Sequence, residues 1–158
     1  MERITWLIPG TLGRSPLPDY SDLIRWQEED VTSIVNLLEE WHREVIRDEM
    51  DLGFTVFHLP VPDFGAPSVS QLHQGVLWID AEISAGRKVI VHCFAGIGRT
   101  GTILIAYLLY KGHSYTAAAG EVNRTGAAPQ SVDQETVLAE YERFLSAVSR
   151  NNVPGQGG

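Results

Sequence analysis

The 158-residue chain has little of several things that mark whole classes of protein. It has a single cysteine, Cys93, so no internal disulfide can form and a small secreted scaffold held by disulfides is excluded. Its only lysines are Lys88 and Lys111, and its 12 basic residues are outnumbered by 20 acidic ones, for a net charge of −8. A surface this acidic repels nucleic-acid backbones and anionic lipids. We therefore expect no nucleic-acid partner and no membrane partner.

Long apolar segments and metal-ligand spacings are missing as well. The longest apolar run, residues 103–110, is far shorter than the roughly 20 residues of a membrane-spanning helix. The first residues show neither the basic nor the apolar region of a secretory signal. The 5 histidines form no HExxH or H-x₃₋₅-H pair. The sequence thus predicts a cytoplasmic protein that uses no metal and no cofactor.

The rest of the composition is that of a folded domain. Hydrophobic residues make up 44% of the chain and charged residues 20%, close to globular averages. No repeat or interior linker interrupts it. We expect one domain over residues 1–150, acting as a monomer. Residues 151–158, rich in Gly and Asn, are expected to form a disordered tail.

The apolar pattern predicts strands that alternate with helices early and helices alone later. Strands are expected over residues 3–8, 31–38, 54–59 and 88–92. Helices are expected over residues 19–30, 68–85, 100–111, 114–123 and 131–149. Residues 39–52 are strongly charged and are expected to form an exposed helix or irregular excursion with a solvated face. This order predicts an α/β fold with a central, mostly parallel sheet flanked by helices.

One segment, between an apolar strand and an apolar helix, combines the residue types of an anion-binding, nucleophilic site. It consists of His92, Cys93, Phe94, Ala95, Gly96, Ile97, Gly98, Arg99 and Thr100. The start of a helix offers unpaired N–H groups and the positive end of the helix dipole to a ligand. The glycines let the backbone turn sharply, so that successive amides can cradle an oxyanion.

The same segment places a nucleophile at the anion site. Arg99 follows Cys93 by six residues, so its guanidinium can return around the loop and grip two oxygens of a phosphate. Helix N-termini and neighbouring cations stabilise cysteine thiolates. Taken singly, the two residues have simpler interpretations, a small buried hydrophobe and a surface arginine. Their combination favours covalent phosphate chemistry.

This pattern, Cys-x₅-Arg preceded by His and followed by Thr-Gly, resembles the signature of the cysteine-dependent protein tyrosine phosphatases. Ile8-Pro9-Gly10, residues 59–64 and Gln134-Glu135 are similar to the small atypical dual-specificity phosphatases and their compact prokaryotic relatives. The resemblance implies a protein-tyrosine-phosphatase-like fold. It also implies metal-independent hydrolysis of phosphotyrosine in a protein or peptide, with phosphoserine and phosphothreonine left open, and inhibition by phosphate-like oxyanions.

The resemblance also implies a role for each matching residue. Cys93 would attack phosphorus and carry a cysteinyl-phosphate intermediate, while Arg99 would hold the phosphate oxygens. Loop amides would share that binding, namely those of Phe94, Ala95, Gly96, Ile97 and Gly98.

Four further residues would assist. Asp63 would be general acid and then general base, and Thr100 would donate a hydrogen bond to the cysteine sulfur. His92 would order the loop, and Gln134 would place the hydrolytic water. Each has a simpler alternative: a turn at Asp63, a helix cap at Thr100, a buried structural histidine, and a capping box between Ser131 and Gln134.

Other functions use similar loops. Rhodanese-like and arsenate-reductase-like domains also have a loop cysteine, but the first needs no distant Asp63 and the second usually needs further cysteines. A phosphate-binding module without activity predicts loss of Cys93, Arg99 or Asp63, all of which are present. A phosphoinositide or RNA-phosphate substrate is disfavoured by the uncharged residues 94–98. Because no second cysteine can form a disulfide with Cys93, we expect peroxide inactivation that an external thiol or a backbone sulfenamide reverses.

Overall fold

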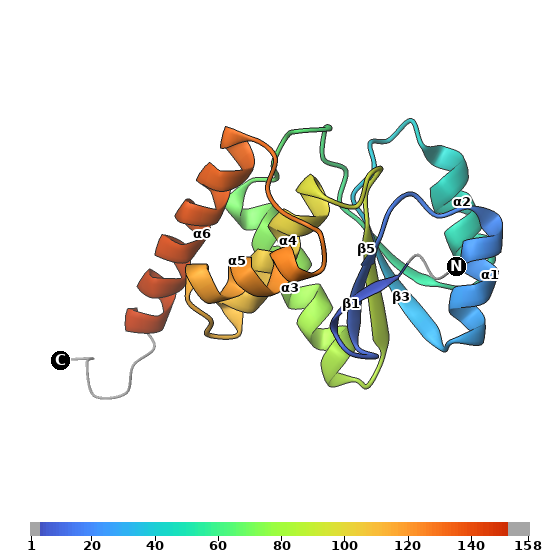
Figure 1. Cartoon of the computed structure of the whole chain (residues 1–158), viewed down its shortest axis with the longest axis horizontal. Coiled ribbons are helices and arrows are strands. Elements are labelled where there is room, and N and C mark those ends of the chain that lie inside the picture. The colour runs from blue at the N-terminus through green and yellow to red at the C-terminus, as the bar shows by residue number, and fades with distance from the viewer. Residues whose placement is uncertain (1–3, 152–158) are drawn as a thin grey trace.

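The computed structural model describes residues 4–151 as a five-stranded sheet with helices on both faces (Figure 1). The strands are β1 (Thr5–Ile8), β2 (Leu12–Ser15), β3 (Val31–Asn36), β4 (Thr55–His58) and β5 (Lys88–His92). The helices are α1 (Tyr20–Glu28), α2 (Arg43–Asp51), α3 (Val69–Ser84), α4 (Gly98–Tyr110), α5 (Tyr115–Arg124) and α6 (Val132–Asn151). Helices α1 and α2 lie on one side of the sheet, and α3 to α6 lie on the other.

Within residues 4–151 the strand order is β1-β2-β5-β3-β4, and only the β1–β2 pair is antiparallel. The expected α/β fold with a mostly parallel sheet is therefore confirmed. Strand β2 was not predicted, because its sequence Leu-Gly-Arg-Ser lacks the β-branched residues of a strand. Gly10, with a positive φ of +62°, makes the turn from β1 into this strand.

The other expected elements are present, the strand over residues 88–92 with the predicted ends and the rest with shifted ends. Asp19 and Ser68 each cap a helix in a reciprocal capping box, with Asp22 and Gln71. Helix α4 begins two residues earlier than predicted. The expected tail falls mostly outside the described residues, at 152–158, while its first residue ends α6. The strand predicted from residue 3 begins at Thr5, and residue 3 itself is also outside them.

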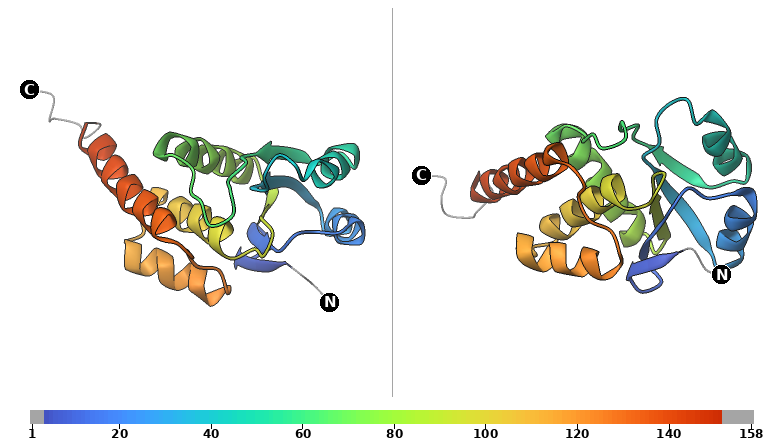
Figure 2. Two further views of the ribbon diagram at one scale, coloured as in Figure 1. Left: turned by 90° about the horizontal axis from the view of Figure 1, so that it is seen from above. Right: turned by 45° about the horizontal axis from the view of Figure 1, so that its top comes forward.

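Helix α4 is enclosed by protein on all sides. It packs against α3, α5 and α6, and the left view of Figure 2 shows it between α3 and α5. Its residues 98–109 are all buried, as expected of a helix that is apolar around its whole circumference. The start of α4 and the carboxyl ends of β3 and β5 meet at one edge of the sheet, where α/β folds bind ligands. None of the helices among residues 4–151 is both long and apolar enough to span a membrane.

The prediction that residues 39–52 form a solvated charged face is wrong at two positions. Helix α2 presents one face to the sheet, and Glu49 lies on that face with Val45 and Ile46, four and three residues earlier. The Glu49 side chain is 0% exposed. Glu39, just before the helix, is also largely covered, with 13% of its side chain exposed. Both carboxylates have cationic or hydrogen-bonding partners at the site described next.

Candidate active site

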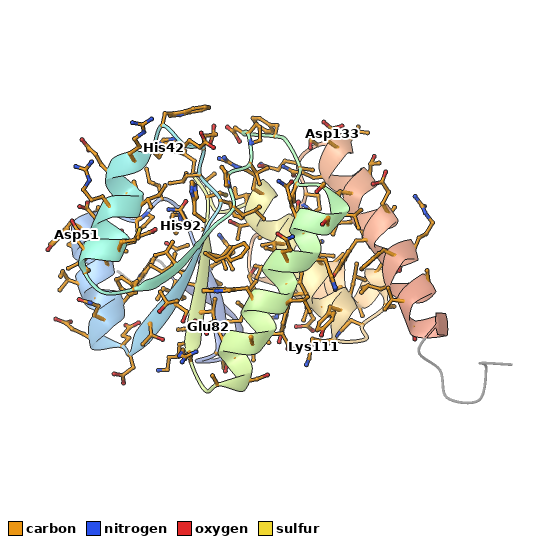
Figure 3. The ribbon with its side chains drawn as sticks, turned by 180° about the vertical axis from the view of Figure 1, so that it is seen from behind. His42, Asp51, Glu82, His92, Lys111 and Asp133 are labelled. Atoms are coloured by element: carbon orange, nitrogen blue, oxygen red, sulfur yellow. The ribbon has the colours of Figure 1, made fainter. Side chains whose placement is uncertain are left out.

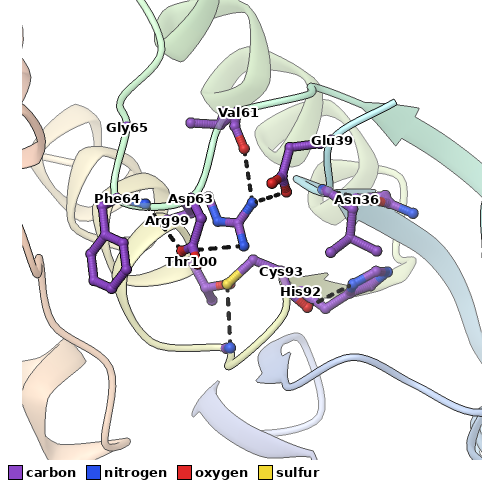
Figure 4. Close-up of polar contacts among 12 residues, drawn as sticks. Asn36, Glu39, Val61, Asp63, Phe64, Gly65, His92, Cys93, Arg99 and Thr100 are labelled. Carbon is purple, nitrogen blue, oxygen red and sulfur yellow. Dashed lines mark hydrogen bonds and ion pairs between the residues drawn. The ribbon is translucent and has the colours of Figure 1, made fainter. Parts of the chain in front are cut away.

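Residues 93–99 form a tight loop around the sulfur of Cys93, which is 2% exposed (Figure 4). The sulfur accepts hydrogen bonds from the backbone N–H of Gly96 at 3.3 Å and from the hydroxyl of Thr100 at 3.1 Å. Both donors stabilise negative charge on the sulfur. We call residues 93–99 the phosphate loop. The helix-cap alternative for Thr100 does not account for its bond to sulfur.

Glycine is required within the phosphate loop by space as well as by backbone conformation. Gly96 has a φ of +75°, and an added Cβ would lie 2.6 Å from the carbonyl oxygen of Ser15. Any other residue would push the loop away from β2. The close approach allows the Gly96 N–H to reach the sulfur.

Arg99, in the first turn of α4, is 4% exposed. Its Nη1 donates to the carbonyl oxygen of Val61 at 2.8 Å and contacts Glu39 Oε1 at 2.5 Å. Figure 4 shows the guanidinium flanked by Glu39 and Asp63. Burial alone would raise the pKa of Glu39, but the hydrogen bond and charge of Arg99 hold it below its usual value. Glu39 is therefore an anion at neutral pH, and it anchors one edge of the arginine.

Asp63 lies at the rim of the same site. Its Oδ1 is 3.6 Å from Arg99 Nη2, and its side chain is 60% exposed. Its Oδ1 also accepts from the Phe64 N–H at 3.0 Å, and Phe64 has a φ of +62°. That backbone conformation is rare for a bulky side chain and marks a strained turn. The turn proposed as the simpler alternative exists, and it brings the carboxylate to the site.

Gln134 is buried where α6 begins, and it contacts the connection that carries Asp63. Its Nε2 donates to the Gly65 carbonyl oxygen at 3.0 Å, and its Oε1 accepts from the Gln130 N–H at 2.7 Å. The capping box with Ser131, the simpler alternative for Gln134, is only half formed. Ser131 Oγ accepts from the Gln134 N–H at 3.2 Å, while the amide oxygen bonds residue 130. Gln134 is thus tied to the rim of the site.

His92 lies beneath the phosphate loop and is 0% exposed. Figure 3 shows it on the side of the sheet that α2 covers. Its Nε2 lies 2.5 Å from Glu49 Oε2, and its Nδ1 lies 3.4 Å from the Cys93 carbonyl oxygen. Glu49 also accepts from Asn36 Nδ2 at 2.8 Å. The short contact with Glu49 on one side and the contact with the Cys93 carbonyl on the other fix the orientation of the ring.

Three residues at or beside the site were not identified from the sequence, namely Arg14, Glu39 and Glu49. Glu49 had a usable signal, because it falls on the apolar face of α2 defined by Val45 and Ile46. Glu39 and Arg14 had none, since their partners are distant in the chain. Arg14 bonds the phosphate loop from β2, a strand that was not predicted.

A Cys-x₅-Arg loop between a central parallel strand and a buried helix defines the protein-tyrosine-phosphatase class of α/β proteins. Residues 14–113 match the family Tc-R-P, described as "Polymorphic toxin system, DSP-PTPase phosphatase". The chain belongs to this family of DSP-PTPase phosphatases, and the sequence-based assignment to the small atypical dual-specificity type is confirmed.

Two relatives and one solved structure illustrate what the chain is similar to. "Uncharacterized protein MJECL20" of Methanocaldococcus jannaschii is 30% identical over 70% of this chain and 76% of its own length. "Phosphatidylglycerophosphate phosphatase PTPMT2" of Arabidopsis thaliana is 25% identical over 90% of this chain and 64% of its own. The crystal structure of Tk-PTP in the active form superposes with a TM-score of 0.83 and 33% identity, covering 89% of this chain and 97% of that one. The chain is thus a phosphatase. The name of one of these relatives refers to a phospholipid substrate.

Proposed function

We propose that this phosphatase hydrolyses phosphotyrosine in proteins or peptides through a cysteinyl-phosphate on Cys93, with no metal or cofactor. The observation that carries the proposal is the environment of the Cys93 sulfur, which accepts two hydrogen bonds inside a loop that also holds the Arg99 guanidinium. Nucleophile and anion-binding groups therefore converge on one point. Phosphoserine and phosphothreonine are weaker substrates in this proposal, and the enzyme works as a cytoplasmic monomer with one domain.

In the first step, inward-facing loop amides and Arg99 hold the non-bridging phosphate oxygens. The Cys93 thiolate attacks phosphorus, so that the S–P bond forms as the bond to the tyrosyl oxygen breaks. Asp63 gives its proton to the leaving oxygen. Its exposed carboxyl group, at the rim beside Arg99, is free to reach a leaving group outside the loop.

In the second step, water attacks the cysteinyl phosphate. Asp63, now ionised, takes a proton from the water, and Gln134 helps to hold that water. The S–P bond breaks, and the hydrogen bond from Thr100 stabilises the departing thiolate. Inorganic phosphate leaves. Vanadate and phosphate, which offer the same oxygens, are expected to inhibit.

Exposed aromatic rings at the site support an aryl phosphate as substrate. Phe94 follows the nucleophile and is 55% exposed, and Phe64 follows Asp63 and is 56% exposed. Both can contact the phenyl ring of a phosphotyrosine, a contact that a phosphoserine cannot make. The side chains of residues 94–98 carry no charge, so they offer no partner for a second headgroup phosphate.

The test is hydrolysis of p-nitrophenyl phosphate in EDTA by the wild type, Cys93→Ser and Asp63→Asn. Turnover should be abolished by Cys93→Ser and strongly reduced by Asp63→Asn. Activity retained in Cys93→Ser would refute the mechanism. A tyrosine-phosphorylated peptide should then be cleaved faster than the same peptide with phosphoserine and than vesicles containing phosphatidylglycerophosphate. Faster hydrolysis of the lipid in the vesicles would show that the preferred substrate is a phospholipid and not a phosphopeptide.

A further inference from the structure

Strand β2 carries an arginine, Arg14, whose guanidinium lies between the phosphate loop and the segment that joins α5 to α6. Its Nη1 donates to the Gly96 carbonyl oxygen at 2.8 Å. Its Nε donates to the Thr125 carbonyl oxygen at 2.7 Å, and Nη2 donates to the same oxygen. Arg14 is half-buried, and its neighbour in the sheet is Val91, two residues before Cys93. All three guanidinium nitrogens thus donate to backbone carbonyl oxygens, which belong to two separate segments of the chain.

The bond to Gly96 sets the direction of a peptide unit in the loop. In a trans peptide the C=O and the following N–H point in opposite directions. When Arg14 draws the Gly96 carbonyl outward, the Ile97 N–H turns toward the centre of the loop. Just beyond β2, the Leu17 N–H donates to the Phe94 carbonyl oxygen at 2.8 Å and turns the next amide inward in the same way. The β2 side therefore holds loop carbonyls away from the place where an anion would bind.

Two glycines lie close to Arg14, one beside its guanidinium and one beside the backbone that follows it. An added Cβ on Gly126, whose φ is +90°, would lie 2.6 Å from Arg14 Nη2. An added Cβ on Gly96 would collide with the backbone next to Arg14, at Ser15. Both glycines have backbone conformations that other residues rarely adopt. The chain is therefore shaped to admit the guanidinium at this position.

Arg14 also acts on the charge of the sulfur. Burial lowers the pKa of its guanidinium, and the negative charge of Cys93 opposes that shift. Arginine nevertheless stays protonated at neutral pH. Coulombic attraction is mutual, so the same cation favours the thiolate of Cys93. The other charged or titratable groups that face Cys93 directly or through one partner are Arg99 of α4, His92 of β5, Glu49 of α2, and the carboxylates Glu39 and Asp63 that contact Arg99.

We infer that Arg14 is a positioning residue of the phosphate loop: it holds the Gly96 carbonyl away from the substrate phosphate and keeps a fixed positive charge beside Cys93. It does not touch the phosphate. Its two bonds to Thr125 tie the loop to the segment that leads to Gln134. The inference rests on the proposed function, because it assigns the loop a phosphate and the sulfur a negative charge.

The test compares Arg14→Met and Arg14→Lys with the wild type in two assays. One measures kcat and KM for p-nitrophenyl phosphate and inhibition by vanadate. The other measures the rate of Cys93 alkylation by iodoacetamide against pH, which follows the thiolate fraction. Arg124→Met is the matched control, since Arg124 is exposed and bonds the Leu7 carbonyl and Glu121 without touching the loop.

Arg14→Met should lower kcat by about 10- to 100-fold, weaken vanadate inhibition and move the midpoint of alkylation to higher pH. Arg14→Lys should keep that midpoint, because the charge remains, and still lose kcat, because an ammonium group cannot bond both carbonyl oxygens as a planar fork does. Gly126→Ala, which crowds the guanidinium, should reproduce the loss of kcat. Arg124→Met should change none of these quantities.

The inference is overturned if both Arg14 variants have the same thermal unfolding temperature, the same kcat and the same pH profile of alkylation as the wild type. If Arg14→Met does not fold, Arg14→Lys decides: wild-type kcat refutes a role for the fork, and reduced kcat with an unchanged alkylation midpoint supports it. Failure of the proposed function is a separate result, namely turnover that survives Cys93→Ser whatever stands at position 14.

Discussion

The phosphate loop and the charged segment 39–51 meet at the same site but contribute to it in different ways. The hydrogen bonds to the Cys93 sulfur come from three and seven residues along the chain, from Gly96 within the loop and Thr100 just after it. The charged segment acts across 60 residues from Glu39 to Arg99 and across 43 residues from Glu49 to His92. In the proposed mechanism, the loop supplies the groups that meet a phosphate. The segment supplies the carboxylates that contact Arg99 of the loop and His92 beneath it.

This division explains why carboxylates lie beside a site that is proposed to bind an anion. An unpaired arginine or histidine enclosed in the protein would be free to turn, and its burial would be costly. Glu39 bonds Arg99 Nη1, which leaves Nη2 facing the rim, where it lies 3.6 Å from Oδ1 of the exposed Asp63. Glu49 bonds His92 on the side away from the loop. The counter-charges orient the cations from behind.

The largest effect is expected where the loop itself is changed. Arg99→Lys keeps the charge but removes the planar fork that, in the proposed mechanism, grips two phosphate oxygens. We expect kcat/KM for p-nitrophenyl phosphate to fall by about 100- to 1,000-fold, the usual cost of losing a donor to the transition state. The thermal unfolding temperature should change little beside that loss. A lysine variant with near-wild-type kcat/KM would show that the fork does not bind the phosphate.

A smaller effect on activity and a larger one on stability are expected at Glu49. Glu49→Leu leaves His92 and Asn36 buried without their carboxylate partner, and breaking a buried pair costs about 3 kcal/mol of unfolding free energy. Glu49→Gln, which can still accept hydrogen bonds, should lose less. Asp51→Asn, at the exposed end of α2, is the control and should leave the unfolding midpoint in urea unchanged. Equal stability of Glu49→Leu and the wild type would mean that the pair contributes nothing.

The same division of labour decides how much of the molecule the sequence predicts. The loop, the capping boxes at Asp19 and Ser68 and the apolar helix α4 were predictable, because each depends on residues within one or two turns of one another. Strand β2 was not, because its four residues become a strand only through pairing with β1 and β5.

The contacts of the missed site residues also depend on tertiary structure. Arg14 reaches Thr125 across 111 residues, and Glu49 reaches His92 only because α2 packs on the sheet. Single-residue propensity contains neither fact. Reacting groups of such a site can thus be found locally, whereas the residues that orient them depend on tertiary structure.

The smallest effect is expected at Glu39. It is a loss of unfolding free energy whose pH dependence shows that it comes from the ion pair with Arg99. The pKa of Glu39 in the folded protein lies below the ordinary 4.5, so its bond to Arg99 adds stability above that pH and is lost as the pH falls through the lower value. Glu39→Gln should therefore reduce the unfolding free energy by about 1 kcal/mol at pH 7. Urea titrations at successive pH values should show the difference from wild type shrinking below pH 4.5.

The neighbouring Glu40, which is exposed, provides the matched control. Glu40→Gln removes the same charge one residue away and should not change the unfolding free energy at either pH, since an exposed carboxylate gains little from any partner. If Glu39→Gln and Glu40→Gln behave alike, or if the Glu39→Gln difference persists at low pH, the stabilisation comes from something other than the ion pair. Arg99 would then be held by its bond to the Val61 carbonyl oxygen, and the connection after β4, rather than the charged segment, would orient the guanidinium.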